Sequence, residues 1–336
     1  MTKTTVGWGL IGTGKIADDR ILPGIIEFAD NRLVAVVSRE QSRADAFAKK
    51  FGAPHAYTNY ADMLANPDVQ VVAIHTPNDR HADEAVAAAR AGKHVFCDKP
   101  MATTVADAER IVRECEKAGV KLGTNFHNRF MPCFLEIKRI IDSGELGDIL
   151  LVQLEASPGA RPGGTLSSWR IDPVAAGLGT TNSIGVHVFD ILRFLLADEI
   201  TEVTSLFDTP RNVMEQIALS IFRFGKGAMA QITIHEIAPY PHNDIVIQGS
   251  RGRIIGRGLT RSRAGGTMEV LSGGGKTRTM EFPATNAHAA SVAAFSAAVR
   301  DNRAPAPSGI DGLRSVQLTE AMAKSAWDKI TVRLAS

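Results

Sequence analysis

A glycine-rich turn near the start of the chain constrains the fold more than any other feature. Residues 6–11 are almost wholly apolar and predict a buried strand, and residues 16–28 predict a helix. Between them, residues 12–17 read Gly-Thr-Gly-Lys-Ile-Ala, the pattern G-x-G-x-x-A. Gly12 permits the tight turn, Gly14 lets a pyrophosphate approach the backbone, and the helix start offers free N–H groups to phosphate. The residues predicted to bind a dinucleotide here are Gly12, Thr13, Gly14, Lys15 and Ile16.

The same alternation of strand and helix continues to about residue 124. Further buried strands are predicted at residues 33–37, 69–75, 93–97 and 120–125, and helices at residues 42–51, 60–65, 79–91 and 104–118. This order predicts a doubly wound parallel sheet of the Rossmann type. Ligands bind such sheets at the carboxyl ends of the strands. Ser38, Thr76, Lys99 and Asn125 follow strand ends, so we expect them to line one crevice with Gly12.

The end of the second strand bears on the choice of cofactor. An acidic residue there would accept hydrogen bonds from the ribose of NAD. This chain has Ser38 and Arg39 instead, with Arg43 one helical turn further on. A guanidinium pairs with phosphate in a charge-assisted fork, so NADP(H) is favoured and NAD(H) is possible. Glu40 leaves a second interpretation open, in which these residues form a solvated helix start that does not discriminate between the cofactors.

After residue 124 the pattern changes to longer strands with alternating polarity. Strands are predicted at residues 149–155, 202–207, 213–224, 228–237, 245–249, 253–256, 268–271 and 277–282, and helices at residues 130–141, 184–196, 287–300 and 313–327. Residues 157–181 form a long irregular segment rich in glycine and proline, typical of a functional or disordered loop. The predicted fold is therefore α/β, with a Rossmann domain (residues 1–124) followed by an α+β domain (residues 125–336) with a large, mostly antiparallel open sheet.

Composition excludes several classes of protein. The formal net charge of +2 gives no strong field for nucleic acid or an anionic membrane. The three cysteines show no C-x-x-C spacing, which fits a reducing compartment and argues against disulfides or a zinc site. No signal-peptide core and no membrane-spanning stretch is evident, so we expect a cytoplasmic protein with no nucleic-acid or membrane partner. Histidine and acidic residues do not cluster at ligand spacing, so no metal is expected.

Several segments in order resemble the Gfo/Idh/MocA family, named for glucose–fructose oxidoreductase, inositol dehydrogenase and rhizopine catabolism. The matching segments are residues 9–17, Thr76-Pro77-Asn78 with His81, and residues 91–100, then 169–173, 185–190, 248–252 and 309–316. The resemblance covers nearly the whole chain. It implies a nicotinamide-dependent oxidoreductase that transfers hydride between the cofactor and a hydroxyl or keto carbon of a sugar, polyol or similar cyclic alcohol. It also implies a homodimer or homotetramer formed through the sheet of the second domain.

The resemblance assigns roles to residues. His187 is the expected acid/base, and Lys99 is the expected cation that stabilises alkoxide character in the transition state. The further residues expected to contact the cofactor are Thr76, Pro77, Asn78, His81, Asp98 and Lys99, together with Ser38, Arg39 and Arg43. The residues expected to contact the substrate are Asn125, Arg129, Trp169, Arg170 and Ser183.

Two positions depart from the family pattern. Asp98 replaces the usual glutamate before Lys-Pro and keeps the carboxylate. Ser183 stands four residues before His187, where members with a catalytic histidine commonly carry aspartate. Serine can hydrogen-bond a hydroxyl but supplies no negative charge. Two alternatives therefore stay open: a non-catalytic nucleotide-sensing or regulatory protein, and a lyase or hydrolase that uses NAD transiently.

Overall fold

The computed structural model describes residues 5–159, 168–211, 213–260 and 265–334. The chain divides into two compact units. The first unit comprises Met1–His127 and Asn286–Val316, and the second comprises Asn128–Thr285 and Gln317–Ser336. The boundary thus falls inside helix α10 (Gly309–Asp328). Residues 286–316, assigned from the sequence to the second domain, belong to the first unit.

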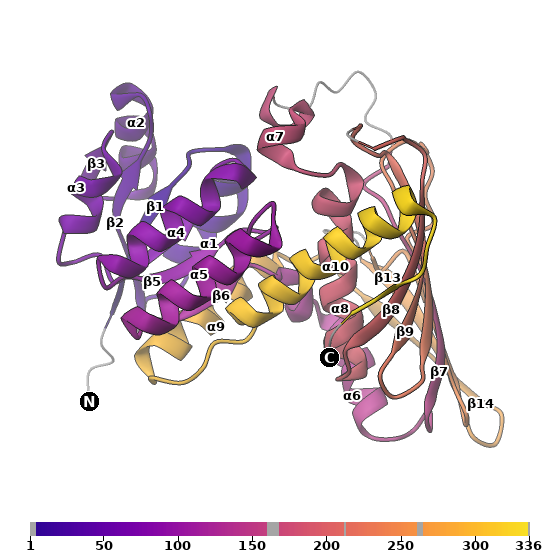
Figure 1. The fold of residues 1–336 in the computed structure, drawn as a ribbon. Coiled ribbons are helices and arrows are strands. Elements are labelled where there is room, and N and C mark those ends of the chain that lie inside the picture. The colour runs from indigo at the N-terminus through magenta and orange to yellow at the C-terminus, as the bar shows by residue number, and fades with distance from the viewer. Residues whose placement is uncertain (1–4, 160–167, 212, 261–264, 335–336) are drawn as a thin grey trace. The chain divides into compact units, whose positions relative to one another are not determined.

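The first unit is built on a six-stranded parallel sheet with strand order β3-β2-β1-β4-β5-β6 (Figure 1). Its strands are β1 (Val6–Ile11), β2 (Asn31–Val37), β3 (His55–Tyr57), β4 (Val71–Ile74), β5 (His94–Cys97) and β6 (Leu122–Thr124). Its helices are η1 (Ala17–Ile21), α1 (Leu22–Ile26), α2 (Gln41–Phe51), α3 (Tyr60–Ala65), η2 (Asn78–Arg80), α4 (His81–Arg90), α5 (Val105–Ala118) and α9 (Ala287–Arg300). The predicted doubly wound sheet is confirmed. The strand order reverses beside β1, so its carboxyl end faces the point where such sheets bind ligands.

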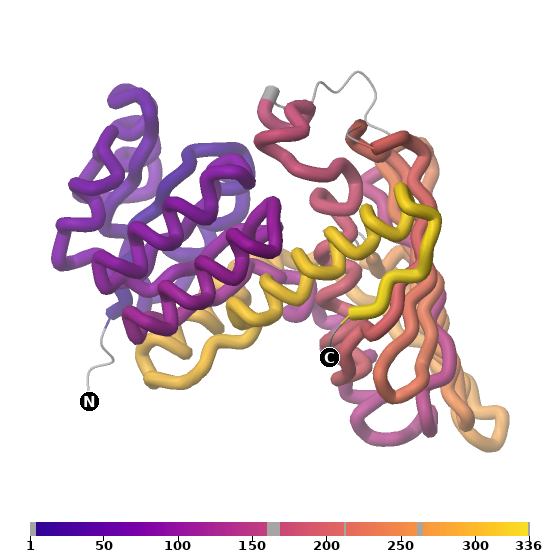
Figure 2. Tube along the Cα trace, viewed as in Figure 1, coloured from indigo at the N-terminus to yellow at the C-terminus, as the bar shows by residue number. Residues whose placement is uncertain are grey.

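Both faces of this sheet are covered by helices, which explains the unbroken apolar runs in its strands. One face buries Trp8 and Phe96 against Phe295 of α9, with ring centroids 6.0 and 5.3 Å from that of Phe295. The other face packs against α4 and α5, with Val95 and Ile111 in its core. The trace in Figure 2 shows α9, in orange, beside this sheet. A C-terminal helix completes the first core, and this explains why residues 286–316 belong to the first unit.

The helix after the glycine-rich turn departs from the predicted single helix over residues 16–28. Its first part, η1, is a π-helix, and α1 continues to Ile26. Single π-turns inside helices are frequent at functional sites. Strand β3 was not predicted, because its three residues are too short to show a periodicity.

The second unit holds a nine-stranded sheet with strand order β14-β13-β12-β11-β7-β10-β9-β8-β15. Its strands are β7 (Ile149–Ala156), β8 (Ile200–Phe207), β9 (Ile217–Phe224), β10 (Met229–His235), β11 (Ile245–Gly249), β12 (Arg253–Arg257), β13 (Gly266–Ser272), β14 (Lys276–Phe282) and β15 (Val332–Arg333). The helices are α6 (Pro132–Asp142), η4 (Ser168–Ile171), α7 (Pro173–Ala176), η5 (Thr181–Gly185) and α8 (Val186–Leu196), with η3 (His127–Phe130) at the boundary. Among the described strands of this sheet, β7 and β10 alone pair in parallel, so the predicted, mostly antiparallel sheet is confirmed.

One face of the second sheet is apolar and covered, and the other carries exposed apolar side chains. Helix α8 covers the first face (Figure 1). There Phe189 of α8 meets Phe222 of β9 edge-on, with ring centroids 5.8 Å apart. On the opposite face Leu206, Leu219 and Ile221 are 65%, 44% and 51% exposed. Leu206 pairs directly with Leu219 across β8 and β9, so these side chains form a continuous patch.

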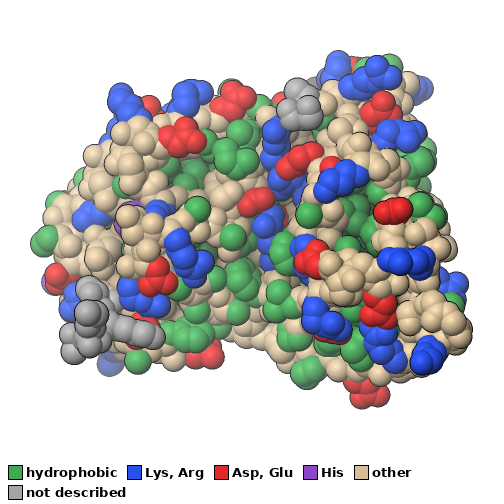
Figure 3. All heavy atoms as spheres, turned by 90° about the horizontal axis from the view of Figure 1, so that it is seen from below, with side chains coloured by type: hydrophobic (Ala, Val, Ile, Leu, Met, Phe, Trp, Pro, Cys, Tyr) green, Lys and Arg blue, Asp and Glu red, His purple; other side chains and the backbone are tan. Residues whose placement is uncertain are grey.

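The predicted irregular segment of residues 157–181 lies partly outside the described residues. Its described part contains η4 and α7, which begins with Asp172 as its N-cap. No helix among the described residues is long and apolar enough to cross a membrane. Lys and Arg side chains are interspersed with Asp and Glu on the face that Figure 3 shows.

Candidate active site

The glycine-rich turn has the geometry that a pyrophosphate requires. Gly12 has φ +98°, and a Cβ on it would stand 2.4 Å from the carbonyl oxygen of His75. Only glycine fits this conformation and this close approach. Beside Gly14 the situation is reversed: apart from its chain neighbours, no described residue has an atom within 4 Å of the place of a Cβ. That space and the helix start at η1 fit the phosphates of a dinucleotide.

Side chains just after β1 and β2 meet beside this turn. The hydroxyl of Thr13 donates to that of Ser38 at 3.1 Å, and both side chains are buried. Arg43 of α2 donates to the Thr13 hydroxyl at 2.8 Å and also to its carbonyl oxygen. Arg39 is exposed. The structure thus brings Ser38 and Arg43 together at the turn, with the Arg43 guanidinium held by backbone and side chain of Thr13.

The end of β4 is supported by buried polar groups of α4. The Thr76 hydroxyl donates to the carboxylate of Glu84 at 2.5 Å. Burial raises the pKa of Glu84 to about 7, and the hydrogen bond from Thr76 opposes this only in part. His81 is 1% exposed, and its ring nitrogens lie 2.8 and 3.0 Å from the carbonyl oxygens of Pro100 and Thr76. Both ring nitrogens of His81 face backbone carbonyl oxygens, and the contact between His81 and the cofactor stays a prediction.

Asp98 is the hub of a polar cluster at the ends of β4, β5 and β6. One of its carboxylate oxygens accepts from the backbone N–H of Lys99 at 2.9 Å and from the Asn125 amide at 3.4 Å. The other lies 3.2 Å from Nδ1 of His75. Burial raises the pKa of Asp98, but His75 and Lys99 beside it outweigh this and hold it well below its usual range. The cluster therefore keeps a carboxylate charge next to Lys99.

Two histidines of this cluster were missed by the sequence reasoning. The ring of His127, which follows β6, stacks on that of His288 in α9 with centroids 3.6 Å apart. Nδ1 of His288 lies 3.3 Å from the side-chain nitrogen of Asn125. The spacing Asn125-x-His127 at a strand end was a usable signal for His127. No local signal marks His288, because its contact spans 163 positions in the sequence.

In the second unit the structure places Ser183 in η5 and His187 in the first turn of α8. The start of this helical segment is fixed by Glu215, which is 1% exposed. Its carboxylate accepts from the backbone N–H groups of Gly179 and Thr181 at 2.9 and 2.8 Å. A buried carboxylate at a helix start both satisfies free N–H groups and complements the helix dipole. Glu215 was not singled out from the sequence, yet it positions the segment that carries Ser183 and His187.

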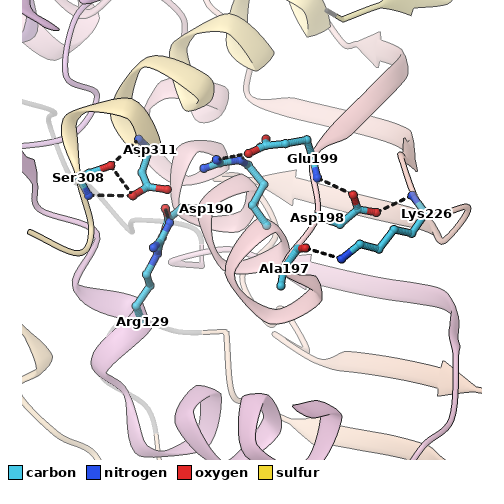
Figure 4. A network of polar contacts seen from close by, with 9 residues as sticks. Arg129, Asp190, Ala197, Asp198, Glu199, Lys226, Ser308 and Asp311 are labelled. Carbon is cyan, nitrogen blue, oxygen red and sulfur yellow. Dashed lines mark hydrogen bonds and ion pairs between the residues drawn. The ribbon is translucent and has the colours of Figure 1, made fainter. Parts of the chain in front are cut away.

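Arg129 of η3 and Asp190 of α8 form a buried ion pair, drawn in Figure 4. The guanidinium donates to both carboxylate oxygens, at 2.8 and 2.5 Å, and Asp190 is 1% exposed. The carboxylate thus holds one edge of the guanidinium, and substrate contact by Arg129 stays a prediction.

The guanidinium of Arg170 stacks on the ring of Trp169, with the guanidinium carbon 4.5 Å from the ring centroid. Among the described residues, no group of histidine, cysteine and acidic side chains could hold a metal ion.

Comparison with known proteins relates this geometry to one family. A model described as an oxidoreductase family with an NAD-binding Rossmann fold matches residues 6–126. A model of the Gfo/Idh/MocA C-terminal domain matches residues 134–255. Together the two ranges cover more than half of the chain.

Individual relatives align with this chain over nearly their whole length. The 1,5-anhydro-D-fructose reductase of Ensifer adhaerens is 30% identical over 95% of this chain and 96% of its own. The inositol 2-dehydrogenase of Rhizobium meliloti is 31% identical over 98% of this chain and all of its own. The structure of an aldose-aldose oxidoreductase from Caulobacter crescentus, complexed with glycerol, is 29% identical, covers 98% of this chain and 100% of its own, and superposes with a TM-score of 0.89. Because both family models match and these relatives align over nearly the whole chain, this chain belongs to the Gfo/Idh/MocA family of NAD(P)-dependent oxidoreductases.

Proposed function

We propose that this protein transfers hydride between NADP(H) and a hydroxyl or keto carbon of a sugar, polyol or similar cyclic alcohol. One observation carries the proposal. Lys99 follows β5 at the carboxyl edge of the first sheet, beside an ionised Asp98, and this edge also carries the dinucleotide turn after β1. The relatives named above, which include a reductase of an anhydrosugar and a dehydrogenase of inositol, support the substrate class.

The chemistry divides between the cofactor and the chain. Bound nicotinamide would accept or donate the hydride. Lys99, held beside Asp98, is proposed to stabilise negative charge on the reacting oxygen as that oxygen gains alkoxide character. His187 is proposed to take the hydroxyl proton in oxidation and to return it in reduction, since imidazole titrates near neutral pH.

A preference for NADP(H) is supported by the residues beside the turn. Ser38, Arg39 and Arg43 replace the acidic side chain that would accept hydrogen bonds from the ribose of NAD. Arg43 is already held against Thr13, so its charge is positioned before a 2′-phosphate binds. A guanidinium fixed in advance loses less entropy on binding than a free one.

Ser183 is the residue that favours a second candidate function. Without the family's usual aspartate, His187 has a hydroxyl, not a carboxylate, one helical turn before it. A nucleotide-sensing protein that binds cofactor without turnover would tolerate this change. A lyase or hydrolase using NAD transiently would instead retain cofactor through purification and give no net reduction.

Assembly and compartment form part of the same proposal. We infer that the apolar patch of Leu206, Leu219 and Ile221 pairs with a second copy of the chain, giving a homodimer or homotetramer through the second sheet. Single exposed apolar residues are ordinary, but a contiguous patch on a sheet face is typical of an interface. Cys97, Cys115 and Cys133 are all free and buried, which supports a reducing cytoplasm.

The decisive experiment is a panel of aldoses, inositols and anhydrosugars assayed with NADP and NAD, following the absorbance of the reduced nicotinamide. Lys99→Ala and His187→Ala should each lower turnover by about two orders of magnitude or more, while nucleotide still binds. Full turnover in both variants on a confirmed substrate would overturn the assignment. Cofactor binding by the wild type without turnover of any alcohol would favour the sensing role.

A further inference from the structure

His288 occupies an unusual position for a histidine of the C-terminal region. It lies in the second position of α9, within the first unit, and stacks on His127 with an interplanar angle of 21°. His127 is 4% exposed, whereas His288 is only partly buried. The pair therefore combines a buried ring with a residue that is partly accessible to a ligand.

The hydrogen bonds around Asp98 determine which nitrogen of His288 carries the proton. An ionised carboxylate only accepts hydrogen bonds, so the side-chain atom of Asn125 that lies 3.4 Å from Asp98 must be the NH₂ group. The same NH₂ group lies 3.3 Å from Nδ1 of His288. Since the amide nitrogen donates, Nδ1 must offer its lone pair, and the proton of the neutral ring resides on Nε2.

Burial, more than the surrounding charges, keeps this ring neutral. Burial, together with the neighbouring His127, holds the pKa of His288 well below its usual value, although Asp98 opposes the shift. His75 and Lys99 act in the same direction as burial. His288 is thus a neutral hydrogen-bond donor at neutral pH.

We propose that His288 is a further substrate-binding residue, whose Nε2–H donates a hydrogen bond to a hydroxyl or carbonyl oxygen of the sugar or polyol. Asp98 orients the side-chain amide of Asn125, and this amide in turn orients the ring of His288. The assignment rests on the proposed function and adds a ligand contact from the first unit. It gives Asp98 two tasks, because the same carboxylate oxygen binds the N–H of Lys99 and orients Asn125.

The test compares two substitutions with a matched control. His288→Phe keeps a ring to stack on His127 but removes both nitrogens, whereas His288→Gln keeps a neutral N–H donor. We expect His288→Phe to lower kcat/KM for the best alcohol of the panel on the order of 10- to 100-fold, the loss of one ligand hydrogen bond. His288→Gln should recover most of that loss. The dissociation constant of NADP(H) should stay the same in both variants.

The control is His94→Phe. His94 is also half-buried in the first unit, but it lies at the start of β5, where its Nδ1 accepts from the backbone N–H of Lys121 at 3.0 Å. It should leave kcat/KM within about twofold of wild type. A loss shared by His94→Phe and His288→Phe, or a His288→Phe variant as active as wild type, overturns the assignment.

The role of Asn125 is tested by a double-mutant cycle. Asn125→Leu should cost less in the His288→Phe background than in the wild type, because its effect passes partly through His288. Equal costs in both backgrounds overturn the orienting role. A wild-type protein that binds cofactor but reduces or oxidises nothing in the panel overturns the proposed function instead, which separates the two failures.

Discussion

Glu84 offers a prediction whose size follows directly from the structure. Its largely buried carboxyl group accepts a hydrogen bond from Thr76, and burial raises its pKa from 4.5 to about 7. A raised folded-state pKa means that the fold prefers the neutral carboxyl group. The stability that this provides is fully present below pH 4.5 and is lost as the pH rises through about 7. Glu84→Gln keeps the size and a hydrogen-bond acceptor for Thr76 but cannot ionise.

The advantage of the variant should therefore grow with pH. At about 1.36 kcal/mol per pKa unit, the raised pKa of Glu84 lowers the free energy of unfolding by about 3.4 kcal/mol above pH 8, where the group is ionised. At pH 5 the same linkage relation lowers the free energy of unfolding by only about 0.8 kcal/mol. The free energy of unfolding of Glu84→Gln relative to wild type should rise by about 2.5 kcal/mol between pH 5 and pH 8.5.

The measurement must report on the first unit alone, because two units need not unfold together. Of the three tryptophans, only Trp8 lies in the first unit, where it is fully buried. Urea unfolding followed by Trp8 fluorescence, in a background with phenylalanine at positions 169 and 327, isolates that unit. Glu109→Gln, on an exposed position of α5, is the control and should show no comparable pH dependence. A relative stability of Glu84→Gln that stays constant from pH 5 to pH 8.5 would refute the reasoning.

Two further predictions concern the cofactor and the assembly. Arg39→Ala should weaken the binding of NADP by about tenfold or more and leave NAD nearly unchanged, as measured by fluorescence titration, since a lost charged hydrogen bond to phosphate costs about 1.5–3 kcal/mol; equal losses for both cofactors would contradict the preference. Ile221→Arg, in the apolar patch on β9, should reduce the molar mass measured by light scattering to that of a single chain. Thr204→Arg, at the position of β8 that pairs with Ile221, should do the same, and an unchanged molar mass in both variants would contradict the proposed interface.

The first sheet could be predicted from the sequence because each of its signals is local. Residues 6–11 read as an apolar run, the glycines that follow permit one kind of turn, and Gly119 closes α5 in the left-handed conformation that glycine favours. The carboxyl-edge residues followed from strand order alone. Parallel strands end at one edge, so Ser38, Thr76 and Lys99 were placed without knowledge of their contacts.

What could not be predicted depends on contacts between segments distant in sequence. The sequence predicts a helix at residues 287–300, but its alanine-rich surface does not indicate which unit the helix packs against. Only the packing in the structure shows that Phe295 of α9 fills the first core beside Trp8. The same packing brings His288 to Asn125. Glu215 likewise caps a helical segment that begins 34 residues before it in the chain. Such pairs carry no periodicity, so sequence patterns do not reveal them.

Among the described residues, the two π-helices lie at the two parts of the predicted site. The π-helix η1 follows the dinucleotide turn, and the π-helix η5 contains Ser183 and leads into His187. A π-turn inserts one residue and rotates the side chains that follow by about 100° around the axis. In η5 the cost of this irregularity is offset by Glu215, whose carboxylate binds the N–H groups of Gly179 and Thr181. The hydrogen bonds that support this π-turn favour a role for the orientation of His187, even though Ser183 carries no carboxylate. A protein that only sensed nucleotide would need the first irregular helix and not the second.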